Sequence, residues 1–297
     1  MYRLGLMKYI RPLILLRLCS LFADQSYVLG GIKAELGNNL FQVAAACAVA
    51  WDHGAEPYFP ELITLPANPQ MISLNYYYIF FRCNVANPGP PSIDWYEPDF
   101  TYYPIQYHPD MRTAGYFQSE KYFSHHRERI LELFAPHPEV IEYVREHYSH
   151  ILNHPCSVGI QIRDYGTPND TYAQYGKDYL RKASRFFPKN ALYVVSSNKI
   201  DFARTAIPEE LENIIFIQGE SHHVDFCLLS LCKHNIISNS TFGWWGAWLN
   251  LNPEKKVIAP QIWFNPSTPL SSLDIIPESW IQIEAKWGPH QDNGWND

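Results

Sequence analysis

The chain has 297 residues, enough for about two domains and for a large buried core without disulfide or metal support. Hydrophobic residues make up 46% and charged residues 18%, a composition that excludes a disordered chain, a collagen and a membrane-embedded bundle. The formal net charge is -7 and no run of Lys or Arg is present, so nucleic acid is not an expected partner.

The first 27 residues are predicted to be an N-terminal extension. Lys8, Arg11 and Arg17 interrupt its apolar run, which is too short to span a bilayer, and no clean cleavage site follows. Two interpretations stay open: a loosely packed extension, and a cationic amphipathic segment lying on a membrane surface. We therefore expect a cytoplasmic protein, or one peripheral to the cytoplasmic membrane face. The six cysteines include no CxxC pair, so buried or free thiols are expected.

Residues 28–150 are predicted to form a loosely built α/β lobe. An apolar run at 27–31 predicts a strand, and the nearly all-apolar stretch 40–51 predicts a buried helix. Residues 56–112 interleave Pro with Tyr and Phe, and we expect mainly loops there. Further helices are predicted at 125–134 and 140–148.

Residues 151–297 are predicted to form a second, more regular lobe, with a boundary near residue 150. Strands are predicted at 157–162, 192–195, 214–217, 236–238 and 257–259, and helices at 177–187, 201–206, 224–234 and 241–250. Strands that alternate with helices are typical of a doubly wound parallel sheet with helices on both faces. The expected fold class is therefore α/β.

In such a sheet, ligands bind beyond the carboxyl ends of the strands. One strand ends at Arg163, and Ser240 lies where a later strand passes into a helix. A helix N-terminus and a guanidinium fork could together hold a diphosphate without a metal, although Ser240 could also be an ordinary helix cap. Asp225, at the start of the preceding helix, could accept two donors from a guanine edge or merely favour the helix dipole.

The segment 236–250, Ile-Ile-Ser-Asn-Ser-Thr-Phe-Gly-Trp-Trp-Gly-Ala-Trp-Leu-Asn, resembles the signature segment of the α-1,2-fucosyltransferases, glycosyltransferase family 11. Segments 36–42, 115–123 and 225–235 agree with that family in the same order. The resemblance implies a GT-B architecture of two Rossmann-like lobes, of which the C-terminal one binds the nucleotide. It also implies inverting, metal-independent transfer of L-fucose from GDP-fucose to a galactoside hydroxyl in glycan biosynthesis, with no cofactor beyond the donor substrate.

The resemblance assigns roles residue by residue. Arg163 matches the arginine that holds the donor β-phosphate, and Asp225 matches the position that recognises guanine in related fucosyltransferases. Ser240 and Thr241 match the phosphate-side hydroxyls. The remaining implied donor-side residues are Gly37, Asn38, Gln161 and Asn239.

The chain also departs from the family pattern. Gln161 stands where the family has His, Asp164 where it has a second Arg, and 196–198 reads Ser-Ser-Asn where it has Ser-Asp-Asp. An insertion, 32–35, precedes the Gly-Asn loop. These departures keep three alternatives open: a transferase for another GDP-sugar, one with a protein O-fucosyl acceptor, and a non-catalytic nucleotide- or glycan-binding relative.

An inverting transfer builds negative charge on the leaving diphosphate, where Arg163 and the helix start at Ser240 would stabilise it. Glu35 and Asp164 are the two candidate bases for the acceptor hydroxyl. The alternatives are a solvated loop carboxylate for Glu35 and an arginine ion pair for Asp164.

Three aromatic or histidine-containing features complete the prediction. Trp244, Trp245 and Trp248 are expected in core and interlobe packing rather than in sugar stacking. The Tyr-rich loop 95–107 is a candidate for acceptor contacts. The sequence His222-His223 followed by Asp225 lacks a third ligand at a supporting spacing, so no metal site is expected.

Overall fold

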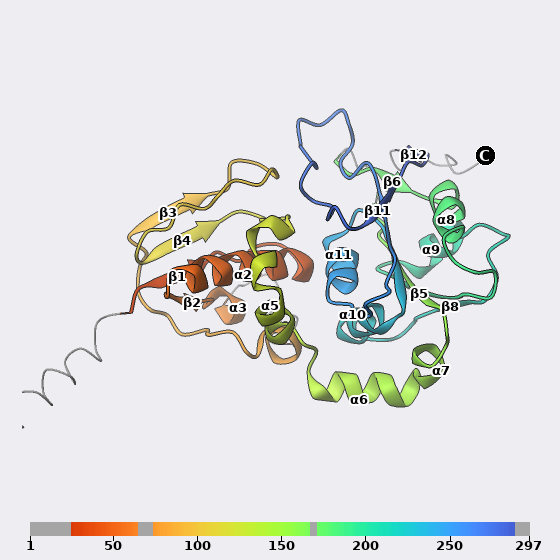
Figure 1. The fold of residues 1–297 in the computed structure, drawn as a ribbon, viewed down its shortest axis with the longest axis horizontal. Coiled ribbons are helices and arrows are strands. Elements are labelled where there is room, and N and C mark those ends of the chain that lie inside the picture. The colour runs from red at the N-terminus through yellow and green to blue at the C-terminus, as the bar shows by residue number, and fades with distance from the viewer. Residues whose placement is uncertain (1–24, 65–73, 167–170, 289–297) are drawn as a thin grey trace, which may run out of the picture.

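The computed structural model describes residues 25–64, 74–166 and 171–288, which contain two parallel sheets surrounded by helices (Figure 1). The predicted N-terminal extension lies outside the described residues except for its last few positions. Within the described ranges, no helix combines the length and the apolar character needed to cross a bilayer. Five cysteines lie in these ranges, and all are free and buried, as predicted.

The first sheet has four parallel strands in the order β2-β1-β4-β3. Their bounds are β1 Tyr27–Gly30, β2 Glu56–Tyr58, β3 Ile93–Tyr96 and β4 Met111–Ala114. Helix α2 (Leu36–Asp52) packs on this sheet and is buried along most of its length. Because neighbouring elements cover α2 on several sides, its sequence is apolar all round rather than along one stripe. Its alanines let these neighbours pack closely against it.

The expectation of loops at 56–112 was wrong in part. This region holds strands β2, β3 and β4, helix α3 (Glu61–Thr64) and a π-helical turn, η2 (Tyr76–Phe80). The strands are only three or four residues long, so an alternating pattern has no room to develop. Pro57 lies in the edge strand β2, where a missing N–H is tolerated.

The second sheet has six parallel strands in the order β11-β10-β9-β5-β7-β8. Counted along the chain, this is the 3-2-1-4-5-6 order of a Rossmann sheet, with its topological switch point between β5 and β9. The bounds are β5 Ser157–Ile162, β7 Leu192–Ser197, β8 Ile214–Phe216, β9 His234–Ile237, β10 Val257–Pro260 and β11 Ile281–Ile283. The five predicted strands are confirmed, and β11 is an addition.

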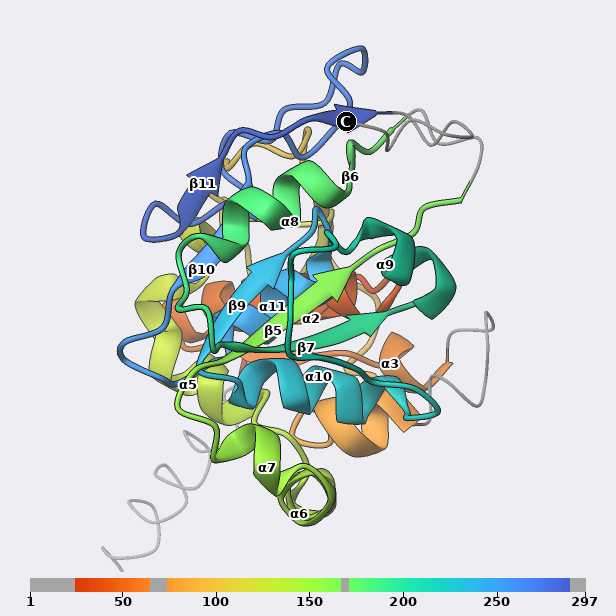
Figure 2. The ribbon, with the colours of Figure 1, turned by 90° about the vertical axis from the view of Figure 1, so that its right-hand side faces the viewer.

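Helices cover both faces of the second sheet, as predicted (Figures 1 and 2). Ile160 and Ile236 point to the face that carries α8 (Lys177–Ser184) and α9 (Ile200–Ala206). The opposite face carries α10 and α11. Their bounds are α10 His222–Leu231 and α11 Thr241–Trp248.

The remaining elements lie between and beside the sheets. After β4 come η3 (Glu120–Tyr122), η4 (Ser124–His126), α5 (Arg127–Leu133), α6 (Pro138–His147) and α7 (Ser149–Leu152). A short antiparallel pair joins β6 (Gln174–Tyr175) to β12 (Trp287–Gly288). The domain boundary near residue 150 stays a prediction.

The tryptophans of α11 lie in the core, as predicted. Trp244, Trp245 and Trp248 are at most 1% exposed. They pack against Phe41 of α2 and Phe123, so α11 joins the second sheet to the helix that covers the first. Large buried aromatic side chains contribute strongly to such packing, and this contact therefore holds the N-terminal ends of α2 and α11 in register.

Candidate functional site

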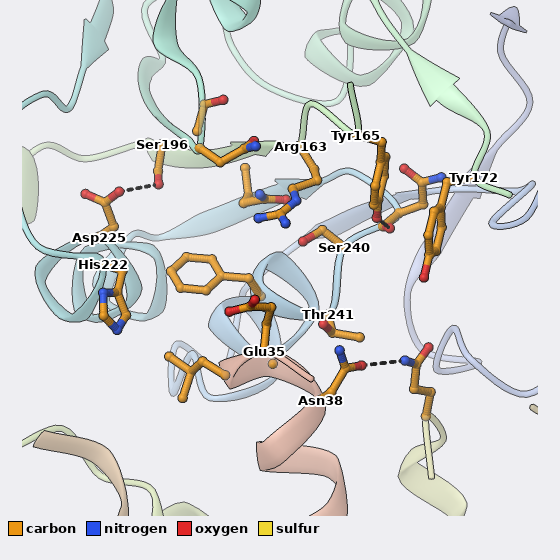
Figure 3. A pocket seen from close by; sticks show the side chains of 18 of the residues that line it. Glu35, Asn38, Arg163, Tyr165, Tyr172, Ser196, His222, Asp225, Ser240 and Thr241 are labelled. Carbon is orange, nitrogen blue, oxygen red and sulfur yellow. Dashed lines mark hydrogen bonds between the residues drawn. The ribbon is translucent and has the colours of Figure 1, made fainter. Parts of the chain in front are cut away.

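A cavity of about 550 Å³ lies at the switch point of the second sheet, facing the start of α2 (Figure 3). Its volume is within the range of small-molecule sites. The lining residues come from both halves of the chain: the loop before α2, the ends of β5, β7 and β9, and the starts of α10 and α11.

Gly37 allows two helix N-termini to meet at this cavity. A Cβ atom at Gly37 would lie 2.5 Å from Thr241 Oγ1 and 2.6 Å from the Thr241 carbonyl carbon, so only glycine permits the contact. Neither N-cap side chain, Glu35 of α2 or Ser240 of α11, accepts a hydrogen bond from its own helix. The ordinary capping role considered for Ser240 is therefore not realised, and both helix starts keep N–H groups available for an anion.

Arg163 adds a formal positive charge at the same place. It follows β5 directly, is half-buried, and its carbonyl oxygen accepts a 2.7 Å hydrogen bond from Gln174 Nε2. Figure 3 shows its side chain directed into the cavity beside Ser240. A guanidinium fork between two helix N-termini suits a group with several negatively charged oxygens, such as a diphosphate.

One end of the cavity carries a carboxylate that lacks a full set of donors. Ser196 Oγ donates a 2.8 Å hydrogen bond to Asp225 Oδ2, whereas buried Oδ1 has no partner among the described residues. Burial raises the pKa of Asp225 to about 6; the Ser196 bond opposes this shift, and the nearby charge of Glu220 adds to it. A ligand that donates N–H groups would satisfy this carboxylate.

The other end of the cavity is aromatic and amide-lined (Figure 3). Tyr165 and Tyr172 stack with ring centroids 4.1 Å apart. Gln118 Nε2 donates a 2.7 Å hydrogen bond to Asn38 Oδ1, which ties the loop after β4 to the start of α2. Flat rings beside amide groups are suited to a sugar, which presents both apolar faces and hydroxyls.

Nine of the ten residues predicted for the site line this cavity. They are Glu35, Gly37, Asn38, Gln161, Arg163, Asp225, Asn239, Ser240 and Thr241. The strand-end rule and the resemblance therefore selected residues that the fold brings together.

Asp164 is the exception. It is not among the described residues that line the cavity, and its side chain is only 5% exposed. Its Oδ1 accepts a 2.9 Å hydrogen bond from the Gly166 N–H, and its Oδ2 lies 3.3 Å from Lys199 Nζ. The carboxylate of Asp164 is thus paired with a lysine rather than with an arginine, and its role as a base stays a prediction.

Gln161 and Asn239 have supporting contacts. Gln161 Oε1 accepts a 2.7 Å hydrogen bond from Ser238 Oγ, which fixes the turn that leads to Ser240. Asn239 Nδ2 donates to the carbonyl oxygens of Ala173 and Trp263. Both side chains are almost completely buried, so they hold the α11 N-terminus against the ends of the neighbouring segments.

Sequence reasoning missed several lining residues. Tyr165 and Tyr172 belong to the irregular segment after Arg163, and Asn75 lies just before η2. Asn75 Oδ1 contacts the Nε2 atoms of His222 at 2.7 Å and His223 at 3.0 Å, so this histidine pair has an amide partner. The single available signal was the position of Tyr165, three residues beyond the end of β5.

The Tyr-rich loop 95–107 contributes no lining residue among those described. It lies close by, however. Phe100 stacks on Tyr116 at 5.3 Å and meets Phe264 at 4.9 Å, and Phe264 meets the lining residue Tyr172 at 5.6 Å. An aromatic row therefore runs from the cavity to this loop, whose role in acceptor binding stays a prediction.

The family described as Glycosyl transferase family 11 matches residues 92–284. The chain belongs to glycosyl transferase family 11. This confirms the family resemblance drawn from the sequence. The matched range includes Arg163, Asp225 and the tryptophan-rich helix α11, but not Glu35 and Gly37 at the start of α2.

Named relatives agree with this family. The chain is 32% identical to an alpha-1,2-colitosyltransferase of Escherichia coli over 57% of its own length and 61% of the relative's, so it spans about three fifths of that protein. It is 27% identical to the galactoside alpha-(1,2)-fucosyltransferase 2 of Sus scrofa, covering 86% of this chain and 79% of the relative.

A solved structure supports the fold. The fucosyltransferase NodZ from Bradyrhizobium superposes with a TM-score of 0.50 at 13% identity, covering 75% of this chain and 93% of that chain. At this identity the likeness concerns the fold alone. It agrees with the predicted α/β architecture of two GT-B-like lobes.

Proposed function

We propose that this protein transfers L-fucose from GDP-fucose to a hydroxyl of a galactoside, forming an α-1,2 linkage in glycan biosynthesis. The observation that carries the proposal is the convergence of Arg163 and two uncapped helix N-termini, those of α2 and α11, in one cavity. Family membership and the names of the relatives support a glycosyl transfer of this class.

The cavity suggests one orientation for the donor. The diphosphate would lie between Arg163 and Ser240, and guanine would donate its N1–H and exocyclic amino N–H to Asp225. The sugar would then reach the end that holds Asn38 and Tyr172 (Figure 3), where Gln118 bonds Asn38. The aromatic row beyond Tyr172 gives the glycan acceptor an approach to the sugar.

In the proposed inverting reaction, the acceptor hydroxyl attacks the anomeric carbon as its bond to the diphosphate breaks. The guanidinium of Arg163 and the two helix starts stabilise the charge that develops on the leaving GDP. These groups are already in place before the bond breaks, and pre-arranged charges of this kind need no further reorganisation. We propose no cofactor or metal in the reaction, because the protein itself supplies the positive charge.

Glu35 is the carboxylate that we propose as the base. It lines the cavity and is exposed, in the loop that enters α2 beside Asn38. The other two lining carboxylates have different surroundings: Asp225 bonds Ser196, and Glu220 bonds Tyr143 and Tyr148.

Glu35→Gln should lower kcat about a hundredfold with little change in the donor KM, because a base contributes to proton transfer rather than to donor binding. Steady-state kinetics would measure kcat and KM separately. An unchanged kcat would exclude Glu35 as the base.

Donor binding should weaken in acid because Asp225 must be ionised to accept N–H donors. Its pKa is raised to about 6 by burial, so protonation removes the acceptor as the pH falls through that value. Calorimetric titration of GDP across this range should show the loss in the native protein. Asp225→Asn should bind GDP more weakly at neutral pH and should lack this part of the pH dependence. GDP's own phosphate titrates identically in both proteins, so the difference between the two profiles isolates Asp225; two parallel profiles would contradict the assignment.

The function itself is tested with donors and acceptors in turn. GDP-fucose, a colitosyl nucleotide, GDP-mannose and UDP-galactose are each incubated with the protein and a panel of β-galactosides, and products are detected by mass spectrometry. We expect a deoxyhexose increment with GDP-fucose. A colitosyl product would favour the second donor, after the name of the Escherichia coli relative. Absence of any product, together with retained GDP binding, would favour a non-catalytic relative.

A further inference from the structure

A second cluster of chemically active side chains lies away from the cavity. Asp52 is the last residue of α2, and His125 and His126 belong to η4. Asp52 Oδ2 lies 3.0 Å from His125 Nε2, and Asp52 Oδ1 lies 2.7 Å from His126 Nε2. Among the described residues, this is the group of histidine and carboxylate side chains whose ligand atoms all lie within 4.8 Å of one another.

The ligand atoms of this cluster and the distances between them fit a divalent transition-metal ion. Zinc binds imidazole nitrogen and carboxylate oxygen at about 2.0–2.2 Å, which in a tetrahedral site holds ligand atoms about 3.3 Å apart. The distances between Asp52 and the two imidazoles need only small increases to reach that value. The side chains are 40%, 48% and 19% exposed for Asp52, His125 and His126, so water can complete the coordination.

Packing contacts position the His126 ring beside Asp52. The ring of His126 meets the ring of Trp51 edge to face at 5.3 Å, and Arg129 lies 3.8 Å from the centre of the same indole. The rings of His125 and His126 are 4.4 Å apart. Asp52 lies two residues beyond Ala50, the last buried residue of α2, so its backbone is anchored to the core. The ligand atoms therefore lie close together before an ion binds.

The cluster lies where the last turn of α2 contacts the segment 118–126. The segment 118–126 contacts α2 at both ends: Gln118 bonds Asn38 in the first turn, and the two histidines bond Asp52 in the last. A 17-residue helix is about 25 Å long, so an ion at Asp52 would lie far from the donor cavity. It would fasten the segment that carries Gln118 without touching the reacting groups.

We propose that Asp52, His125 and His126 bind one zinc-type divalent metal ion, which clamps the end of α2 to η4. This site is independent of the proposed glycosyl transfer. Its loss would lower the stability of the 118–126 segment, whereas the donor would still bind.

The test uses the full chain, stripped of metal with a chelator and titrated calorimetrically with Zn²⁺. We expect one ion per chain and a higher melting temperature in its presence. Asp52→Asn and His126→Ala should each weaken zinc binding at least about tenfold, the loss seen when even indirect partners of a metal ligand are changed. His147→Ala is the matched control, because this exposed histidine lies on α6 outside the cluster, and it should bind zinc like the native chain.

Two results would overturn the proposal. One is the absence of zinc binding by the native chain, which would leave the cluster as an imidazole–carboxylate hydrogen-bonded group. The other is binding that persists undiminished in the double variant His125→Ala/His126→Ala, which would place the ion elsewhere. Far-ultraviolet circular dichroism checks that each variant is folded, and the visible absorption of Co²⁺ bound to the native chain reports the ligand set without any substitution.

Discussion

Arg163→Ala is expected to lower kcat/KM for the donor about a hundredfold to a thousandfold, the effect of removing a key transition-state charge donor. The guanidinium is directed into the cavity beside Ser240, and the helix starts there offer only partial charges (Figure 3). Its removal leaves the developing diphosphate charge without a full countercharge. Rates measured at several GDP-fucose concentrations would separate binding from turnover, and the larger loss should be in kcat.

Two further substitutions make this result interpretable. Arg163→Lys should recover only part of the activity, because an ammonium supplies charge without the planar fork that binds two oxygens at once. Arg185→Ala is the matched control, since this arginine is exposed at the end of α8 outside the cavity lining. Native kinetics in Arg163→Ala would exclude the proposed diphosphate position.

The second sheet was more predictable than the first, for a physical reason. Strands β5 and β7 are six residues long and lie centrally, so each contains enough buried residues to give a recognisable strand pattern between helices. Strands β2 and β3 are shorter and lie at the edges of their sheet. A few half-exposed residues between prolines do not differ from a loop in composition, and tertiary pairing alone makes them strands.

The residues of the site also differ in how far the sequence predicts them. Arg163 and Ser240 were predictable because parallel topology brings strand ends together whatever the loops do. Tyr172 and Asn75 were not, since their positions depend on irregular segments. Asp164 follows Arg163 directly, but adjacency in the chain does not bring two side chains into one cavity. Arg163 lines the cavity, whereas Asp164 turns to Lys199.

One residue that departs from the family pattern, Asn198, bonds the backbone of another, Asp164. The N–H of Asp164 donates a 2.9 Å hydrogen bond to Asn198 Oδ1, and Asn198 Nδ2 donates a 2.9 Å bond back to the Asp164 carbonyl oxygen. The side chain of Asn198 therefore joins the ends of β5 and β7. These two bonds use the backbone of Asp164 and do not depend on its side chain. A third altered position, Gln161, lines the cavity together with Arg163 and Ser240, which match the family.

Gly37→Ala is expected to damage both stability and donor binding. Its methyl group would lie 2.5–2.7 Å from Thr241 and from the backbone nitrogen of Phe242, so the two helix starts must separate. Overpacking of this kind costs about 1–3 kcal/mol, which corresponds to roughly tenfold to hundredfold weaker donor binding if the cost falls on the cavity. Calorimetric GDP titration and thermal unfolding would measure the two effects.

Ala34→Gly is the informative comparison. It changes the loop just before α2, three residues from Gly37, and the expected change in stability has the opposite sign. Ala34 has a φ of 64°, a conformation that costs an L-residue about 1 kcal/mol and that glycine adopts freely. This variant should keep or slightly raise the melting temperature and should bind GDP normally. If Gly37→Ala also bound GDP normally, the contact between the N-termini of α2 and α11 would not be what forms the anion site. If both variants lost binding, the loop's conformation rather than the helix contact would control the cavity.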